Sequence, residues 1–135
     1  MFLLNDLLIR IQNGIQLRRN FVIVIRSKLC LEVLKLLYKE GYINGFAVFD
    51  NDHNKLIVFL KYYENNPIVK KFKIISKPSK RFFLSNRKII NFLANQGLFI
   101  ISTSDYGLVT SDFLFKNKLF LKKKPGGEIL FKVCF

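Results

Sequence analysis

Apolar positions along the first 25 residues follow two periods, one typical of a helix and one typical of a strand. The helical i, i+3, i+4, i+7 spacing is made by Leu4, Leu7, Leu8 and Ile11. Asn5 or Asp6 suits the positive start of this helix, and Gly14 predicts its end. Residues 20–25 are β-branched and aromatic, which favours a strand. The chain is therefore expected to begin with an amphipathic helix that leads into a strand.

The next segment repeats the helical period and then changes to a hairpin pattern. Ser27 is a typical helix N-cap, and Gly41 predicts the end of that helix. The apolar face between them comprises Leu29, Val33, Leu36 and Leu37. Residues 46–49 and 56–62 are strand candidates on either side of the polar turn 51–54. The resulting α-β-α-β-β order predicts a compact α+β unit.

Residues 63–67 are polar and end in proline, which predicts a linker. Residues 68–75 then favour a strand, although their lysines weaken the pattern. Residues 76–81 are expected to form a turn or loop, because Pro78 has no N–H for a strand ladder.

The rest of the chain predicts one helix between strands. Ser85 suits the helix N-cap and Gly97 its end, and the inward positions are Ile89, Ile90 and Leu93. Residues 98–102 and 127–134 are apolar and predict strands.

The whole pattern predicts an α+β fold of two small α/β subdomains packed together. The N-terminal domain, residues 1–66, has the α-β-α-β-β order, and the C-terminal domain, residues 67–135, is β-α-β-rich.

The two halves of the chain also differ in net charge. Up to Pro67 there are 9 basic and 6 acidic residues, and after it 14 basic and 3 acidic, so +11 of the net charge of +14 lies in the second half. This excess favours a polyanionic partner, because each neutralised phosphate releases counterions. An anionic membrane surface is the competing interpretation.

Several classes of function are not indicated by the pattern. No apolar run reaches the ~18–20 residues that span a bilayer, and the N-terminus lacks a signal-peptide cleavage pattern. Cys30 and Cys134 are far apart without zinc-site spacing, and His53, the single histidine, falls in a polar turn. We therefore expect free thiols, no metal and no cofactor. No catalytic constellation is readable, so neither an enzyme nor a small-molecule substrate is expected.

The first candidate binding segment follows the apolar strand 98–102. Ser102, Thr103 and Ser104 offer short hydroxyls to phosphate, ribose or base edges, and Gly107 permits close approach of an RNA backbone. The alternative is a turn whose hydroxyl groups bond their own backbone.

The second candidate is the loop around residues 77–83. Lys77, Lys80 and Arg81 suit phosphates, and Phe82 or Phe83 suits stacking on an unpaired base. The alternative is one core phenylalanine beside solvated lysines.

The third candidate comprises the lysines at 122–124, the pair Gly126-Gly127 and Glu128. It lacks the spacing of a Walker phosphate loop, and Glu128 is either an organiser of neighbouring donors or an ordinary ion-pair partner. Outside these segments, Arg10 and Asn13 fall away from the apolar stripe of the first helix, so they are expected to face a partner and are counted among the RNA-binding candidates.

Taken in order, these segments resemble the small ribosomal subunit protein eight family, also called S-eight. The resemblance covers nearly the whole chain and rests on residues 6–14, 27–29, 41–43, 60–62, 75–78 with Arg81, 97–104 and 126–130. The most specific pair is Ser102-Thr103-Ser104 followed by Gly126-Gly127-Glu128, each at a predicted strand end.

The resemblance implies two small α+β domains and a structural role in the small ribosomal subunit. Family members bind an irregular helix in the central domain of small-subunit rRNA, mainly through the C-terminal domain, and help to assemble the platform. By position, the resemblance assigns RNA binding to Ser102, Thr103, Ser104, Gly107 and Glu128. Phe83 stands where the family often has tyrosine, and Lys77 replaces an arginine, which keeps charge but loses the planar fork. The partners implied are rRNA and neighbouring small-subunit proteins, without a membrane.

The chain also departs from the family. Ser79 replaces a glycine, and Asp105-Tyr106 stands where one lysine is usual. The stretch 111–125 is longer than usual, and it is expected either to contact an organelle-specific neighbour or to fill space left by shortened RNA.

The high content of Phe, Ile, Asn and Lys is typical of a protein encoded by an A+T-rich genome, and the resemblance begins close to Met1. We therefore expect an organelle-encoded protein of the mitochondrial ribosome, with a plastid or the bacterial cytoplasm as the alternative. The competing function is a non-specific basic module for membrane surfaces or proteins, without preference among RNAs.

Overall fold

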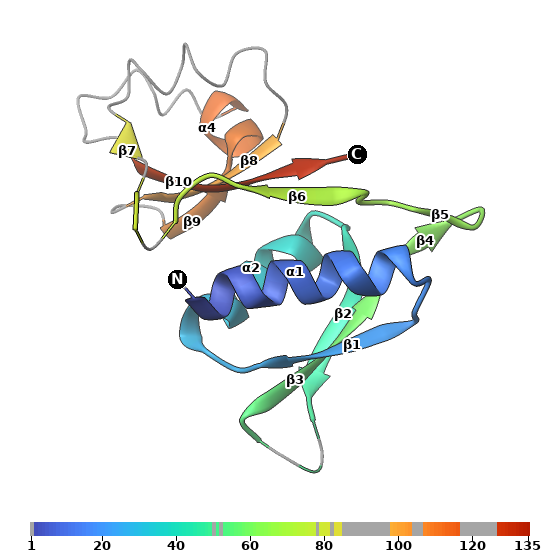
Figure 1. Ribbon diagram of the computed structural model, residues 1–135. Coiled ribbons are helices and arrows are strands. Elements are labelled where there is room, and N and C mark those ends of the chain that lie inside the picture. The colour runs from blue at the N-terminus through green and yellow to red at the C-terminus, as the bar shows by residue number, and fades with distance from the viewer. Residues whose placement is uncertain are drawn as a thin grey trace. The chain divides into compact units, whose positions relative to one another are not determined.

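The computed structural model describes residues 2–49, 51, 53–77, 79–81, 83–84, 98–103, 107–116 and 127–135. The chain divides into two compact units, one of Met1–Phe72 with Phe135 and one of Lys73–Cys134 (Figure 1). The helix predicted between Ser85 and Gly97 and the lysines at 122–124 lie outside the described residues.

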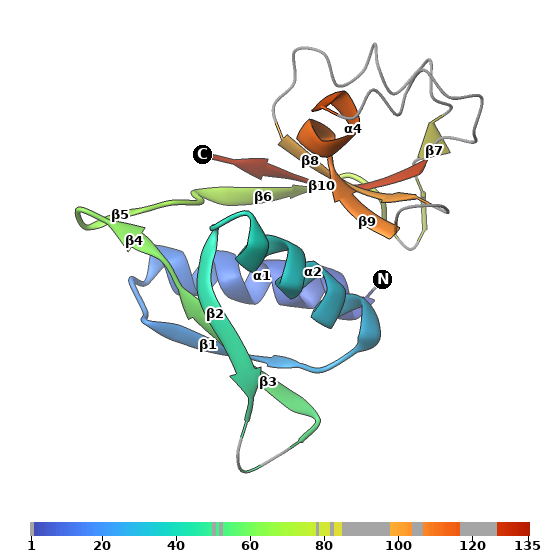
Figure 2. The ribbon, with the colours of Figure 1, turned by 180° about the vertical axis from the view of Figure 1, so that it is seen from behind.

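The first unit has the predicted α-β-α-β-β order. Its elements are α1 (Phe2–Gln16), β1 (Phe21–Ile25), α2 (Lys28–Lys39), β2 (Ile43–Val48) and β3 (Lys55–Leu60). The strands form an antiparallel sheet in the order β1-β3-β2, and both helices cover one face of it (Figures 1 and 2). The helix-facing positions of β3, Leu56, Val58 and Leu60, are buried, as is the predicted stripe of α1. The apolar face of α1, which follows the 3.6-residue period, and the apolar face of β3, which follows the 2-residue period, therefore belong to one core.

Helix α1 does not end at Gly14, so this prediction was wrong. The helix continues to Gln16, and Arg18 takes the left-handed conformation that ends it, with φ of 55°. A Cβ atom on Gly14 would lie 2.4 Å from Val22 Cγ1 and 3.1 Å from Leu60 Cδ1. Glycine is needed there for close packing of the helix against the sheet, and a single sequence does not distinguish this use from a helix stop.

Both predicted ends of α2 are confirmed. The Ser27 side chain accepts a hydrogen bond from the Cys30 backbone N–H at 3.1 Å, and Gly41 follows the helix with φ of +83°. The buried face is turned slightly from the predicted one: it comprises Cys30, Val33, Leu34 and Leu37, whereas Leu29 and Leu36 are half-buried.

Residues 63–67 are not a linker but part of a tight hairpin. Strand β4 (Tyr62–Tyr63) pairs with β5 (Asn66–Pro67), and Glu64 and Asn65 between them both have positive φ. Two such residues match the twist of a hairpin. The strand predicted over 68–75 is shorter, β6 (Lys71–Ile74), and spans the division between the units.

The second unit is built on one antiparallel sheet. It contains β7 (Phe83–Leu84), β8 (Leu98–Thr103), β9 (Gly107–Thr110), α4 (Ser111–Lys116) and β10 (Gly127–Cys134). The strand order is β6-β10-β8-β9, and β7 also pairs with β10. The predictions of β8 and β10 are confirmed, and both are largely buried.

Strand β9 and helix α4 were not predicted. Their junction is held by two hydroxyl groups: Thr110 Oγ1 accepts from the Phe113 N–H, and the buried Ser111 Oγ accepts from the Phe99 N–H, both at 3.2 Å. Helix α4 begins the stretch 111–125, of which residues 117–125 lie outside the described ranges. Within the described ranges, no helix has the length and apolar character needed to cross a membrane.

Candidate nucleic-acid interface

Four strands of the second unit meet at one end of the sheet and align three of the predicted binding residues. Glu128 at the start of β10 is the register partner of Ser102 near the end of β8 and of Phe83 in β7. Directly opposed residues in antiparallel strands point to the same face, and neighbouring strands lie about 4.8 Å apart. Phe83, Glu128 and Ser102 therefore form a row across the sheet.

The loop end of the β8–β9 hairpin adds two further predicted residues. Thr103 pairs with Gly107, and Thr103 Oγ1 donates to the Gly107 carbonyl at 2.9 Å. Gly107 is exposed and has φ of +69°, and a Cβ atom added to it would meet no other atom within 4 Å. Thr103 thus bonds the backbone of its own turn, whereas Gly107 leaves open space beside it. We call Phe83, Ser102, Thr103, Gly107 and Glu128 the strand-end surface.

Gly127 allows β10 to reach this position. A Cβ atom there would lie 2.6 Å from the Ser102 carbonyl oxygen and 2.9 Å from Ile101 Cγ2. The first obstacle is backbone, so a side chain would have to displace the strand itself. The glycine before Glu128 therefore sets the distance between Glu128 and Ser102.

The Glu128 carboxylate holds an unused acceptor. Its Oε1 atom is buried and has no hydrogen-bond partner among the described residues, and the residue as a whole is half-buried. A buried acceptor without a donor costs stability, roughly 1–3 kcal/mol for a typical group. Such an atom is suited to a donor supplied by a ligand, for example a ribose hydroxyl or a base amino group.

The turn or loop predicted at residues 76–81 carries three exposed cations and lies just before β7 in the chain. The backbones of Lys77 and Lys80 exchange two hydrogen bonds, of 2.9 and 3.0 Å, which closes a tight turn. Before the turn, the Ile75 and Ser76 N–H groups both donate to the carbonyl of Leu130, where β10 is bulged. The turn is thus tied to the strand that carries Glu128. We call Lys77, Lys80 and Arg81, all exposed, the cationic turn.

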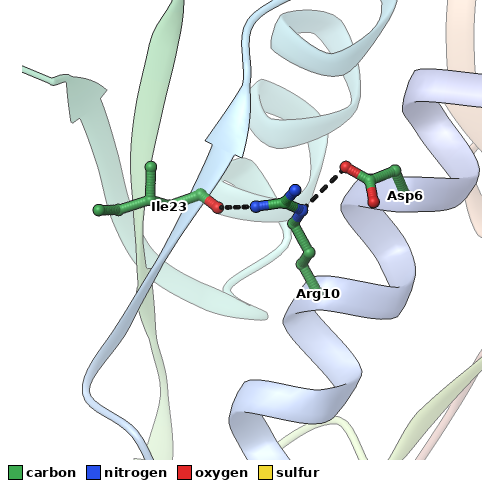
Figure 3. A network of polar contacts seen from close by, with 3 residues as sticks. All are labelled: Asp6, Arg10 and Ile23. Carbon is green, nitrogen blue, oxygen red and sulfur yellow. Dashed lines mark hydrogen bonds and ion pairs between the residues drawn. The ribbon is translucent and has the colours of Figure 1, made fainter. Parts of the chain in front are cut away.

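Arg10 and Asn13 are exposed on α1, in the first unit, so the structure does not join them to the strand-end surface. Figure 3 shows Arg10 between Asp6 and the carbonyl of Ile23 on β1. Its Nε donates to Asp6 at 2.9 Å and its Nη1 to Ile23 O at 3.1 Å. Arg10 and Asn13 line a groove with Arg19 and Phe21, which sequence reasoning missed. The sequence signal that could have indicated this groove was an aromatic residue, Phe21, directly after the basic pair Arg18-Arg19.

The remaining predictions concern the histidine, the two cysteines and the possible metal ligands. His53 is exposed in its turn, as predicted, and both cysteines are free, with Cys30 buried and Cys134 half-buried. Burial raises the pKa of the Cys30 thiol above its ordinary value of 9.0. Ser104 and Phe82 lie outside the described residues. In the ranges that are described, no three His, Cys, Asp or Glu residues are grouped as metal ligands would be.

Comparison with known proteins agrees with the resemblance found in the sequence. The family model for ribosomal protein S8 matches residues 3–134. Small ribosomal subunit protein uS8m of Acanthamoeba castellanii is 38% identical over 135 residues, covering 98% of this chain and 99% of the relative. Protein uS8 of Malacoplasma penetrans is 38% identical, covering 94% and 93%, and uS8 of Buchnera aphidicola subsp. Baizongia pistaciae is 36% identical, covering 95% and 93%. With the α+β fold described above, these matches show that the chain belongs to the ribosomal protein S8 family.

Proposed function

We propose that this chain binds small-subunit rRNA through the strand-end surface and the cationic turn, and in this way serves as a structural constituent of the small ribosomal subunit. The observation that carries the proposal is the convergence of five predicted binding residues, drawn from β7, β8, β9 and β10, at one end of one sheet. The cationic turn is tied to the same strand, β10.

Each residue of the row suits a different part of an irregular RNA helix. Phe83 is 63% exposed, so its ring is available for stacking on an unpaired base. The Ser102 hydroxyl has no hydrogen-bond partner among the described residues and offers a donor and an acceptor. Glu128 Oε1 accepts from a ribose or base donor. Lys77, Lys80, Arg81 and Ser104 complete the proposed site.

The charge distribution supports the second half of the chain as the principal RNA-binding part. We propose the functional division at residues 1–66 and 67–135, with central-domain rRNA of the platform on the C-terminal part. The separation into two compact units and the net charge of +11 after Pro67 support it. Neighbouring small-subunit proteins are the other partners.

The chain is a protein of the mitochondrial ribosome, as its similarity to uS8m of A. castellanii over almost the full length of both chains supports. The bacterial uS8 relatives support the bacterial cytoplasm as the alternative. Family membership supports a structural role without catalysis. We propose neither a small-molecule substrate nor a membrane partner.

The proposal is tested by altering single side chains of the row. Ser102→Ala and Glu128→Gln each change few atoms, and each is expected to weaken binding to a central-domain rRNA fragment by about 1–3 kcal/mol, the usual cost of removing a good contact. Filter binding at constant salt measures this. Glu32→Gln, an exposed glutamate on α2 outside the proposed site, is the matched control. Wild-type affinity in both row variants, with folding intact, would overturn the site.

A further inference from the structure

The sheet of the first unit has an apolar face that its helices leave uncovered. Both helices lie on the other face, where Val24, Leu56 and Val58 are buried, and no described element of this unit covers the second face (Figures 1 and 2). Because side chains alternate along a strand, the register assigns the residues of the second face. We call them the open face, and they are Phe21, Ile23 and Ile25 on β1, Ile57 and Phe59 on β3, and Gly45 and Ala47 on β2.

Strand pairing makes the open face one continuous apolar surface. Phe21 and Phe59 are direct register partners on neighbouring strands. The next row crosses all three strands through Ile23, Ile57 and Ala47. Side chains opposed in this way lie within contact distance of each other. The middle of the open face therefore contains no polar side chain.

Much of this apolar surface is exposed to solvent. Phe21 is 48% exposed, Ile25 is 40% exposed and Phe59 is 39% exposed, and Ala47 is exposed as well. Single exposed apolar residues are common on protein surfaces, whereas a contiguous group of them marks an interaction site. The open face is therefore expected to be covered by a partner.

Basic residues border the open face at both ends of its strands. Arg19 precedes β1 and Lys61 follows β3, so both lie at one end of the antiparallel pair. Arg26 follows β1 and Lys55 begins β3, at the other end. The sequences of the three strands contain no Asp or Glu, and the two aspartates of the β2–β3 turn, at 50 and 52, lie outside the described residues. The described border is positive and suits carboxylates on a partner.

Charge and polarity together decide which occupant fits the open face best. A second copy of this chain would bring the same cations against each other across a two-fold contact, and each chain already carries a net charge of +14. RNA could stack on the rings, but the middle of the face offers no donor to phosphates or base edges, and interfaces with nucleic acids are rich in such polar contacts. An apolar protein surface with an acidic border matches both the middle and the border.

We propose that the open face is a docking site for a partner protein that presents an apolar surface bordered by Asp and Glu. Protein interfaces commonly have an apolar, aromatic centre and a charged rim, as this face has. The open face is smaller than the roughly 20–30 residues a side of a stable interface, so the contact is expected within an assembly rather than between two isolated proteins. The inference rests on the proposed place of the chain in the small ribosomal subunit, but it uses no residue of the strand-end surface.

The test places a photoreactive phenylalanine analogue, trifluoromethyl-diazirinyl-phenylalanine, at position 59 of the full chain. The same analogue at position 38 is the matched control, because Tyr38 is an exposed ring on α2, which lies on the other face of the sheet. Small subunits assembled with each chain are isolated by sedimentation and irradiated. The carbene that forms inserts into protein and RNA alike, and mass spectrometry identifies the molecule and the segment that are attached.

We expect position 59 to attach to one partner protein, at a segment that combines apolar residues with Asp or Glu, and position 38 not to attach to that segment. Lys55→Glu reverses a charge of the border and should lower the yield of this adduct at least about threefold. Lys28→Glu, at an exposed lysine of α2, should change the yield less than about twofold.

Attachment of position 59 to rRNA, to a second copy or to another segment of the same chain would overturn the docking site, and so would attachment to no molecule. An adduct whose yield does not fall in Lys55→Glu would also overturn it, because the partner would then lack the acidic border. Sedimentation separates these results from the proposed function. A wild-type chain that does not sediment with small subunits would contradict both proposals, whereas a chain that sediments and attaches to no protein would contradict the docking site alone.

Discussion

At the scale of single residues, three glycines of this chain meet three different physical requirements. Gly14 removes a clash with the side chain of Val22, and Gly127 removes one with the backbone of β8. Gly107 faces open space and instead supports a positive φ. In the sequence these glycines look alike, and only the structure distinguishes the clash with backbone, which no rotamer change relieves, from the other two.

Gly127→Ala is expected to lower the free energy of unfolding by about 1–3 kcal/mol, the range of overpacking in a core. The physical reason is the 2.6 Å separation between the new Cβ atom and the Ser102 carbonyl oxygen. Urea titration measures the change. Gly45→Ala is the control, since the nearest atom there lies 4.0 Å away on the Phe59 ring. Equal stability of the two variants would contradict the close approach of β10 to β8.

Cys30 is expected to stay protonated in the folded protein beyond the pH at which a free thiol ionises. Burial raises its pKa above 9.0, so its contribution to stability is fully present below about pH 9 and is lost as pH rises through the folded-state pKa. At pH 9, iodoacetamide should therefore modify Cys30 much more slowly in the native protein than in urea. Native labelling of Cys30 at the unfolded rate would show that the thiol is not buried.

At the scale of elements, helix starts and buried strands were predictable because local chemistry determines them. Ser27 caps α2 through its own hydroxyl, and the apolar run of β10 coincides with the observed strand, Gly127–Cys134. The errors came where tertiary contacts decide. Gly14 lies inside α1 because of packing, and the β4–β5 hairpin depends on two non-glycine residues, Glu64 and Asn65, with positive φ. Asn65 favours such a conformation but Glu64 does not, so the pair gives no clear hairpin signal in the sequence.

Ser27→Ala should destabilise the first unit by about 1 kcal/mol, because the Cys30 N–H would lose its side-chain acceptor at the start of α2. Thermal unfolding followed by circular dichroism detects such a change. Ser27→Asp, which restores an acceptor and adds favourable charge at the helix start, should recover the stability. If Ser27→Asp unfolds as readily as Ser27→Ala, the destabilisation has another cause than capping.

At the scale of the whole molecule, sequence patterns predicted which segments carry the site but not how they meet. Ser102, Phe83 and Glu128 are distant in sequence, and their shared row depends on strand register across β7, β10 and β8. Charge counting placed the basic excess after Pro67, yet it gave no sign that Arg19 and Phe21 complete a groove in the first half. Spatial convergence of this kind requires the fold.

Charged and uncharged residues of the RNA interface should differ in their dependence on salt. Replacing Lys77, Lys80 or Arg81 by glutamine should lower the slope of log K against log salt by about 1 for each phosphate that is no longer neutralised. Ser102→Ala should lower affinity at every salt concentration and leave the slope unchanged, because it removes no charge. Filter binding over a salt series gives both quantities. A wild-type slope in all the cationic-turn variants would remove these side chains from the RNA interface.

The most direct test of specific rRNA recognition compares a fragment of central-domain small-subunit rRNA with a scrambled fragment of equal length. Binding of the full chain is measured for both across a salt series. We predict tighter binding to the true fragment, with a preference that persists at physiological salt, where phosphate attraction alone is weak. Equal affinity for the two fragments, falling together as salt rises, would contradict specific recognition and leave a basic surface that attracts any polyanion.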